Sequence, residues 1–245
     1  MSTNLDYISP PVPLDLIQKE LTKDRFIRIT NKGSNEIYIV NHHNSPNVIH
    51  EIGRLRELTF ASAGGGTGQS IDIDKYDTSE NCFNQLIVWA PESKEIIGGY
   101  RFIDCSKIID TEPLELATQR YFNYSDQFKK DYLPYTVELG RSWVQPNFQP
   151  SNVSRRGIFA LDNLWDGLGS IVVDNPHIKY YSGKVTLYSS YNKEARDALM
   201  YFLNYYFNDP DKLILPIKPV SISSDIEEFK AVSYTHLTLP TTPYV

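Results

Sequence analysis

Cysteine is scarce in this sequence, with only Cys82 and Cys105 among 245 residues. So few cysteines cannot form a disulfide framework, and they favour a reducing compartment in which both thiols are inert. Long apolar runs are also missing, since no stretch approaches the ~20 residues that a membrane-spanning helix needs. The start, MSTNLDYISPPV, has neither the basic beginning nor the apolar run of a signal peptide. These absences predict a cytoplasmic protein.

An excess of positive charge is absent as well. The chain has 24 Lys and Arg against 30 Asp and Glu, a formal net charge of −6, which argues against broad nucleic-acid binding. Any anion site must therefore be local and built from a few arginines. Hydrophobic residues make up 41% of the chain, enough for one sizeable core. The 13% of aromatic residues leaves room for peripheral contact with a membrane, at its inner surface.

Motifs of common catalytic and metal sites are missing. There is no G-x-S-x-G and no Ser/His/Asp pattern, and the adjacent histidines of NHHNS have no Cys or Glu at zinc spacing. The acids Asp72, Asp74 and Asp77 of DIDKYD lack the glycine and the distal glutamate of an EF-hand. We interpret them as solvated acids or as partners of Arg54 and Arg56. The sequence predicts no metal site.

One glycine-rich stretch, AGGGTGQS at residues 63–70, comes within one residue of a nucleotide-binding P-loop. A P-loop connects a strand to a helix, and its lysine neutralises the phosphates. Here Gln69 stands where the lysine would be, and the residues before the loop have the apolar spacing of a helix. We therefore interpret residues 64–68 as a mobile turn that leaves a helix.

Hydrophobic periodicity predicts six strands and three main helices. The expected strands are 26–31, 36–41, 84–91, 95–104, 136–145 and 178–188. The expected helices run over 45–60 with Ser45 as N-cap and Pro46 at the first position, from about 157 with Gly167 and Gly169 ending it, and from the cap Asn192 onward. This order predicts an α/β (α+β) fold, a central mixed sheet with helices on both faces, whose later strands are joined in parallel by crossover helices.

Charged residues inside predicted strands are the first candidates for a site. VELGRSWV at 137–144 places Glu138 and Arg141 in an otherwise apolar strand, where burial must be offset by pairing or by function. Strand alternation would send them to opposite faces, but a bulge at Gly140 would bring both onto one face and splay the strand from its neighbour. A structural ion pair is the alternative. Arg101 follows two glycines that allow close backbone approach.

A second candidate is the pair of arginines in SRRGIF. Arg155 and Arg156 stand before the helix predicted from Gly157. The helix dipole disfavours cations at this end, so an anion that offsets both charges is one explanation. A solvated surface pair is the other.

Four runs in this order resemble a known family: SPNVIHEIGRLRELTFASAGGGTGQSIDIDKYD, QLIVWAPESKEIIGGYRF, VELGRSWV and YNKEARDALMYFL. They are similar to the bacterial N-acyltransferases of the GNAT superfamily that make ornithine and glycine lipids, members of which are labelled hemolysins. The resemblance covers most of residues 10–230, although the region around SRRG replaces the superfamily's Q/R-x-x-G-x-G/A loop. It implies a GNAT-like acyl-CoA N-acyltransferase fold. It also implies transfer of a (3-hydroxy)fatty acyl group to the amine of an amino-acid acceptor from a thioester on acyl carrier protein or CoA, with no permanently bound cofactor.

The E-L-G-R strand and the G-x-R hairpin also resemble acyl-homoserine-lactone synthases, in which the matching glutamate and arginine lie in the active site. On this resemblance Glu138, Arg141 and Arg101 are expected to be catalytic. Asp74 and Asp77 match acidic positions near the substrate entrance and are expected to bind substrate.

The resemblance also suggests a mechanism. Glu138 would take the ammonium proton, backbone N–H groups at the bulge would stabilise the oxyanion, and Arg155, Arg156 and Gly157 would hold the phosphate of the phosphopantetheine arm. Two alternatives stay open. One is an acetyl-CoA-dependent N-acetyltransferase of a small amine. The other is a non-catalytic, hemolysin-like lipid-binding protein, against which the lack of a strongly basic amphipathic helix argues.

The last stretch, AVSYTHLTLPTTPYV, differs in kind from the rest. It has no Asp, Glu, Lys or Arg, is rich in Thr and Pro, and shows no structural period. It resembles the translation of a sequencing adapter. We expect a single domain over residues 1–231, truncated at its C-terminus, and a non-native or disordered tail over 232–245. A floppy native tail is the alternative.

Overall fold

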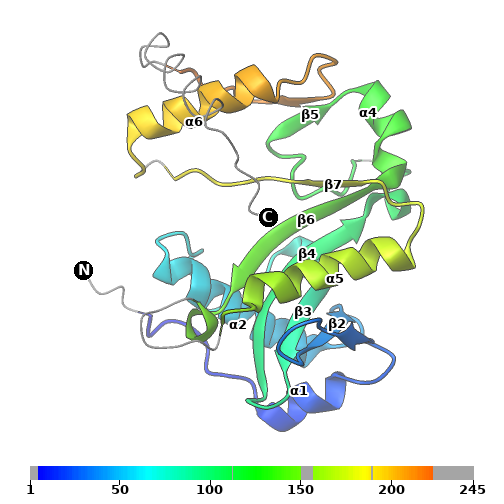
Figure 1. The fold of residues 1–245 in the computed structure, drawn as a ribbon, viewed down its shortest axis with the longest axis vertical. Helices are drawn as coiled ribbons and strands as arrows, with labels where there is room; N and C mark the ends of the chain where they lie inside the picture. The colour runs from blue at the N-terminus through cyan, green and yellow to red at the C-terminus, as the bar shows by residue number, and fades with distance from the viewer. Residues whose placement is uncertain (1–4, 112, 150–156, 189, 223–245) are drawn as a thin grey trace, which may run out of the picture. The chain divides into compact units, whose positions relative to one another are not determined.

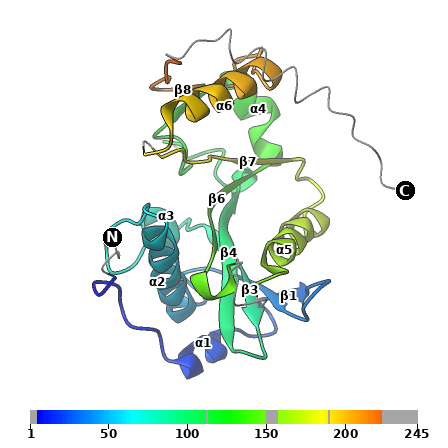
Figure 2. The same cartoon turned by 60° about the vertical axis from the view of Figure 1, so that its left-hand side comes forward.

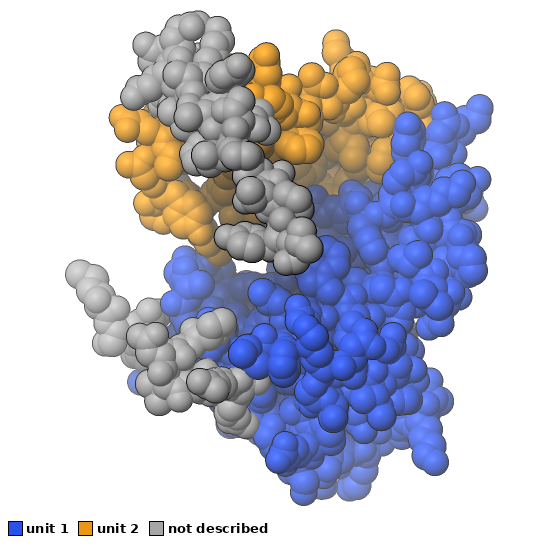
Figure 3. Space-filling model, viewed as in Figure 1, with its two compact units in different colours: residues 1–117, 129–184 blue, residues 118–128, 185–245 orange. Residues whose placement is uncertain are grey.

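The computed structural model describes residues 5–111, 113–149, 157–188 and 190–222. The predicted tail at 232–245 lies outside these residues. Contacts divide the chain into two compact units, shown in blue and orange in Figure 3. Unit 1 comprises residues 1–117 and 129–184, and unit 2 comprises residues 118–128 and 185–245. A compact unit need not fold alone, so the single domain stays a prediction.

A six-stranded sheet forms the body of unit 1 (Figure 1). Its strands are β1 (Phe26–Ile29), β2 (Glu36–Val40), β3 (Asn84–Ala90), β4 (Glu95–Asp104), β6 (Thr136–Val144) and β7 (Tyr180–Gly183). They are ordered β1-β2-β3-β4-β6-β7, and all neighbours are antiparallel except β6 and β7, which are parallel. Helix α5 (Ala160–Asp174) connects the two parallel strands. The mixed sheet and its crossover helix confirm the predicted fold class.

Helices cover both faces of this sheet. Helix α2 (Pro46–Ser62) lies on one face and α5 on the other (Figure 2). Two apolar clusters result. On the α2 side the cluster includes Ile52, Leu55, Ile87, Trp89 and Trp143. On the α5 side it includes Leu86, Phe102, Val137, Leu164 and Leu168.

Shorter elements complete both units. Unit 1 also contains α1 (Leu14–Glu20), α3 (Lys75–Thr78), η1 (Cys105–Lys107), η2 (Leu133–Tyr135) and η3 (Pro146–Phe148). Unit 2 contains α6 (Lys193–Tyr206) and an antiparallel pair of strands, β5 (Phe122–Tyr124) and β8 (Ile214–Pro216). Helix α4 (Asp126–Asp131) includes the boundary between the units. In the described part of the chain, no helix combines the length and apolarity that crossing a bilayer requires.

The predicted helix caps differ in outcome. Asn192 caps α6, because its Oδ1 accepts a hydrogen bond from Ala195 N at 2.9 Å. Ser45 precedes α2 as predicted, but its side chain makes no cap bond. The carboxylate of Glu20 accepts instead from the N–H groups of Asn47 and Val48, the second and third residues of α2, at 3.2 and 2.9 Å. A residue distant in sequence therefore caps α2.

The predicted end of α5 is wrong. Gly167 and Gly169 were expected to stop this helix, but it continues to Asp174. A Cβ on Gly167 would lie 2.7 Å from Leu86 Cδ2. This glycine therefore lets the helix pack closely on β3.

The predicted inner face of α5 is also shifted. Ile158, Leu161, Trp165 and Leu168 recur at helical spacing in the sequence, which predicts that they share one buried face. Only Leu168 is buried, and the other three side chains are 65%, 65% and 66% exposed. The buried face consists of Ala160, Asn163, Leu164, Gly167, Leu168, Ser170 and Ile171. Several of these residues are small. Helix α5 therefore packs on the sheet through its small side chains rather than through its largest ones.

Candidate active site

A β-bulge interrupts β6 where it passes β4. Arg101 on β4 is opposite Gly140, and Gly99 is opposite Trp143. Two residues of β6, Arg141 and Ser142, therefore face one residue of β4. Arg141 has a φ of 48°, in the left-handed region that few non-glycine residues adopt. The bulge was predicted at Gly140, and the structure places the unusual backbone at Arg141.

The bulge decides which face Arg141 occupies. Glu138 is opposite Ile103 on β4, and Gly140 is opposite Arg101, so Glu138 and Arg101 point to the same face of the sheet. Regular alternation would send Arg141 to the other face. Instead, Arg141 and Arg101 both contact Asp74. The three predicted catalytic residues therefore share the face that α2 covers.

A buried ion cluster lies on this face. Arg56 of α2 is 0% exposed. Its Nε donates to Asp72 Oδ2 at 3.0 Å, and its two terminal nitrogens donate to Asp77 at 3.0 and 3.2 Å. The backbone N–H of Asp72 donates to Gly53 O at 2.9 Å, which anchors the segment before α3 onto α2. The prediction that these acids pair with arginine is confirmed for Arg56.

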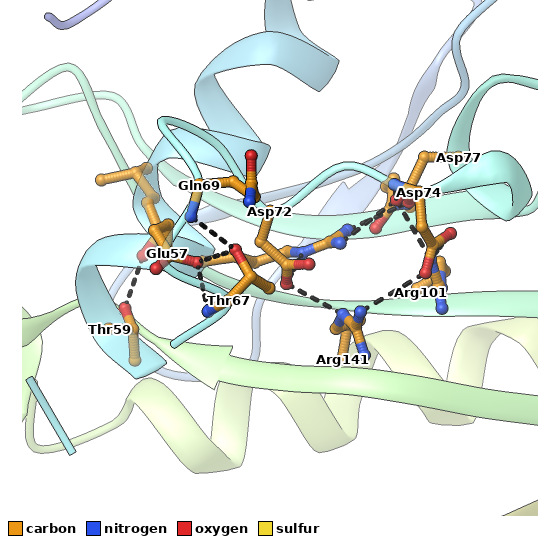
Figure 4. Close-up of polar contacts among 12 residues, drawn as sticks. Glu57, Thr59, Thr67, Gln69, Asp72, Asp74, Asp77, Arg101 and Arg141 are labelled. Atoms are coloured by element: carbon orange, nitrogen blue, oxygen red, sulfur yellow. Dashed lines mark hydrogen bonds and ion pairs between the residues drawn. The ribbon is translucent and has the colours of Figure 1, made fainter. Parts of the chain in front are cut away.

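Two strand arginines complete the cluster. Arg101 Nη1 donates to Asp74 Oδ1 at 2.7 Å and to Asp77 Oδ2 at 3.0 Å. Arg141 Nε lies 2.8 Å from Asp72 Oδ2, and its Nη2 lies 3.3 Å from Asp74 Oδ2. Figure 4 shows both arginines directed toward these carboxylates. The cluster, defined as Arg56, Arg101, Arg141, Asp72, Asp74 and Asp77, carries three charges of each sign.

Asp77 is enclosed by its partners. It is 0% exposed, and beyond the arginines its Oδ1 accepts from Gln85 Nε2 at 2.8 Å and its Oδ2 from Asp74 N at 2.9 Å. Burial opposes ionisation, but the charges of Arg56 and Arg101 outweigh it and lower the pKa of Asp77 to about 2. Both oxygens are occupied, so Asp77 is placed to hold arginines. Asp74 is 30% exposed at its side chain, and it remains accessible to a substrate.

Glu138 is almost fully buried, at 2% exposure. Its Oε2 accepts a hydrogen bond from Ala117 N at 2.9 Å. Burial first, and the charge of Glu138 second, raise the pKa of the Cys105 thiol to about 12, so this cysteine stays protonated. The parallel pairing of β6 with β7 ends at Leu139 and Gly183. Glu138 therefore lies in the second-last pair of the parallel ladder, shortly before the bulge.

An internal carboxylate occupies the glycine-rich loop. Glu57 of α2 is 0% exposed, and its oxygens accept from Thr67 N at 2.8 Å, Thr67 Oγ1 at 2.6 Å and Gly68 N at 2.9 Å. The Tyr7 hydroxyl donates to the same carboxylate at 2.8 Å. Burial works against the charged form, but these hydrogen bonds outweigh it and lower the pKa of Glu57. The loop amides that a phosphate would need are therefore already used.

The predicted donor-binding residues are only partly described. Arg155 and Arg156 lie outside the described residues. Gly157 is buried, and a Cβ there would lie 1.5 Å from Phe148 O. Only glycine fits at this position, because the backbone of η3 lies too close for any side chain. Among the described residues there is also no group of three or more His, Cys, Asp or Glu that could hold a metal ion.

Comparisons with known proteins show the family to which this chain belongs. The Acetyltransferase (GNAT) domain family matches residues 55–156, which include the cluster and Glu138. A glycine N(alpha)-acyltransferase of Phocaeicola vulgatus is 50% identical over 224 residues, 90% of this chain and 68% of the relative. The chain belongs to the GNAT-type N-acyltransferases. A second such relative, the glycine N(alpha)-acyltransferase of Bacteroides thetaiotaomicron, is 49% identical over 231 residues, 93% of this chain and 68% of the relative. No solved structure matches the chain significantly.

This N-acyltransferase uses residues that the sequence did not single out. Glu57 and Gln85 are both buried. Glu57 accepts hydrogen bonds from the glycine-rich loop, and Gln85 donates to Asp77 of α3. A carboxylate on the inner side of a predicted helix is a detectable signal, because an unpaired buried charge is costly. Gln85 offers no such signal, since an amide at the start of a strand is common.

The hydrogen bonds of Glu57 predict that replacing this residue will loosen the glycine-rich loop. Changing Glu57 to Gln replaces one acceptor oxygen with an NH₂ group that faces N–H and O–H donors. We expect a loss of about 1 to 3 kcal/mol in unfolding free energy and faster hydrogen exchange at Thr67 and Gly68. Hydrogen-exchange mass spectrometry measures this. Glu80→Gln, at an exposed glutamate, is the control, and unchanged exchange in Glu57→Gln would show that the loop orders itself without the carboxylate.

Proposed function

We propose that this N-acyltransferase moves a (3-hydroxy)fatty acyl group from a thioester on acyl carrier protein to the amine of glycine, in the synthesis of glycine lipids. The observation that carries the proposal is the 50% identity, over 90% of this chain, with a protein named glycine N(alpha)-acyltransferase. Because the product would carry an acyl chain, we place the reaction in the cytoplasm at the inner membrane surface.

The reaction needs a neutral amine. Glycine is an ammonium zwitterion near neutral pH, so its nitrogen must lose a proton before it attacks the thioester carbonyl. Glu138 is the proposed base, acting directly or through one water. Glu138 is buried and lies on the same face of the sheet as Arg101 and Arg141, which supports this role. The C–N bond then forms, the C–S bond breaks, and the leaving thiolate takes up a proton.

The tetrahedral intermediate needs donors for its oxyanion. A bulge takes residues out of the regular ladder, and here Arg141 and Ser142 together face Tyr100. The parallel partner β7 ends its pairing at Leu139. We propose that backbone N–H groups at this bulge bind the oxyanion, a contribution of about 3 kcal/mol per donor.

The donor is proposed to be acyl carrier protein rather than free CoA. Arg155, Arg156 and Gly157 precede α5, and the arginines would bind the phosphate of the phosphopantetheine arm by charge-assisted hydrogen bonds. On a body of net charge −6, such a local basic site would also attract an acidic carrier protein.

The test is an assay of the full chain with defined donors and acceptors. We would offer 3-hydroxyacyl carrier protein, the matching acyl-CoA and acetyl-CoA, each with glycine or ornithine, and identify products by mass spectrometry. N-acylglycine from the carrier-protein donor is the expected product. Acetylation alone would overturn the fatty-acyl proposal and favour a small-amine acetyltransferase. Lysis of red cells without any donor, and no transfer, would favour a non-catalytic lipid-binding protein.

A further inference from the structure

The three arginines of the cluster differ in how far they are enclosed. The side chains of Arg56 and Arg101 are 0% and 3% exposed, whereas that of Arg141 is 22% exposed. Arg141 contacts Asp72 through Nε and Asp74 through Nη2, and its Nη1 has no partner within the part of the chain that the structure describes. Arg141 is thus the cluster arginine that can still bind another anion.

The exposed part of the cluster presents both signs of charge side by side. Asp74, 30% exposed, lies 3.3 Å from Arg141 Nη2, while the buried members balance one another. Because the cluster as a whole is neutral, its net charge does not favour a simple anion over a simple cation, although Arg141 and Asp74 each present a local charge. A small zwitterion, whose opposite charges are one carbon apart, matches this surface.

We propose that Arg141 binds the carboxylate of the acceptor amino acid, so that it selects α-amino acids over simple amines. The inference rests on the proposed function and adds a specificity-determining residue to it. The guanidinium fork matches a carboxylate in geometry as well as in charge. Because the bulge puts Arg141 on the face of Glu138, a carboxylate on Arg141 would direct the neighbouring ammonium toward that base.

Asp72 and Asp74 act as positioning residues for Arg141. A non-glycine residue at φ 48° persists only where its surroundings fix it, and these two carboxylates hold the guanidinium from the segment before α3. Both acids keep another arginine when Arg141 is removed, because Asp72 also pairs with Arg56 and Asp74 with Arg101. Loss of Arg141 therefore leaves no unpaired carboxylate in the cluster.

The backbone at Arg141 provides a clean variant. Glycine adopts positive φ without strain, so Arg141→Gly removes the guanidinium and keeps the bulge. Arg141→Lys keeps the charge but loses the fork. Arg28→Gln, on the exposed edge strand β1, removes the same charge elsewhere and is the matched control.

The experiment compares glycine with glycinamide, which has the amine but no carboxylate. Arg141→Gly should lower kcat/KM for glycine by about 10- to 100-fold, the equivalent of one charge-assisted hydrogen bond, mainly through KM. The value for glycinamide should stay within about threefold. Each variant is compared with wild type for the same acceptor, so the different basicities of the two amines cancel. Arg141→Lys should fall between, and Arg28→Gln should match wild type.

The outcomes separate the inference from the proposed function. An equal loss for both acceptors in Arg141→Gly, with an unchanged melting temperature, would overturn the carboxylate role while glycine acylation by wild type still supports the function. Wild-type enzyme that acylates neither acceptor would overturn the proposed function, and the inference with it.

Discussion

Replacing Glu138 with Gln should lower kcat by at least about 100-fold and leave the KM for the acyl donor nearly unchanged. A positioned general base contributes about 10²- to 10⁴-fold, and an amide cannot accept the ammonium proton. The substitution preserves shape, and the Gln oxygen can still accept from Ala117 N, the contact that Glu138 makes at 2.9 Å. The loss should therefore be chemical rather than structural.

Single-turnover kinetics with preformed acyl donor measure this effect. Because the base acts on the acceptor amine, its loss should reduce the rate of the chemical step and spare donor binding. Glu92→Gln, at an exposed glutamate in the β3–β4 turn, is the control. A Glu138→Gln enzyme that retains kcat within threefold would assign proton removal to another group.

The largest expected effect on stability is that of Asp77→Asn. Removing one partner from a buried ion pair costs about 3 to 5 kcal/mol, since the remaining charge is left uncompensated. Asp77 has two such partners, Arg56 and Arg101, and is itself 0% exposed. The loss is a large share of the ~5 to 15 kcal/mol that stabilises a typical domain. Urea unfolding at pH 7 measures it.

The same contact predicts an acid-dependent stability. The folded pKa of Asp77, about 2, is below its ordinary value of 3.8, so the folded state holds this proton less tightly than the unfolded state. The stabilisation is therefore fully present above about pH 4 and is lost as the pH falls toward 2. The difference between wild type and Asp77→Asn should narrow over that range.

A surface pair gives the control for both measurements. Asp15 and Lys19 on α1 are 3.2 Å apart, but their side chains are 65% and 71% exposed. Asp15→Asn should change the unfolding free energy by less than about 1 kcal/mol. An Asp77→Asn protein as stable as Asp15→Asn would mean that the cluster does not hold the segment before α3 in place.

The strand VELGRSWV shows how far sequence reasoning reaches. Alternation of side chains is a local rule, and it correctly indicated that Glu138 and Arg141 share a face only if the strand is irregular. The same reasoning chose Gly140, the residue with the freest backbone. The structure puts positive φ at Arg141 instead, and two ion pairs to the segment before α3 hold the side chain of this arginine. Those partners are some seventy residues away in sequence, and no local pattern reports them.

The helices show the same limit of sequence reasoning. Periodicity correctly predicted that α2, α5 and α6 exist, since each repeats apolar residues along the chain. It did not predict which face of α5 turns inward, because Gly167 allows a close contact with Leu86 that no hydrophobicity scale rewards. Whether a helix forms depends on its local sequence, whereas which of its faces is buried depends on the surface against which it packs.

The carboxylate inside the glycine-rich loop has a consequence for how this motif competes with ligands in a cell. Glu57 belongs to α2, the helix that leads into the loop, so it meets the amides of Thr67 and Gly68 as an intramolecular ligand. A tethered group acts at an effective concentration of about millimolar or above. Free phosphate or nucleotide would have to exceed that concentration to displace Glu57. Displacement would also leave the buried carboxylate of Glu57 without its hydrogen-bond donors. A chain can thus keep the glycine spacing of a phosphate-binding loop while being permanently saturated by one of its own side chains.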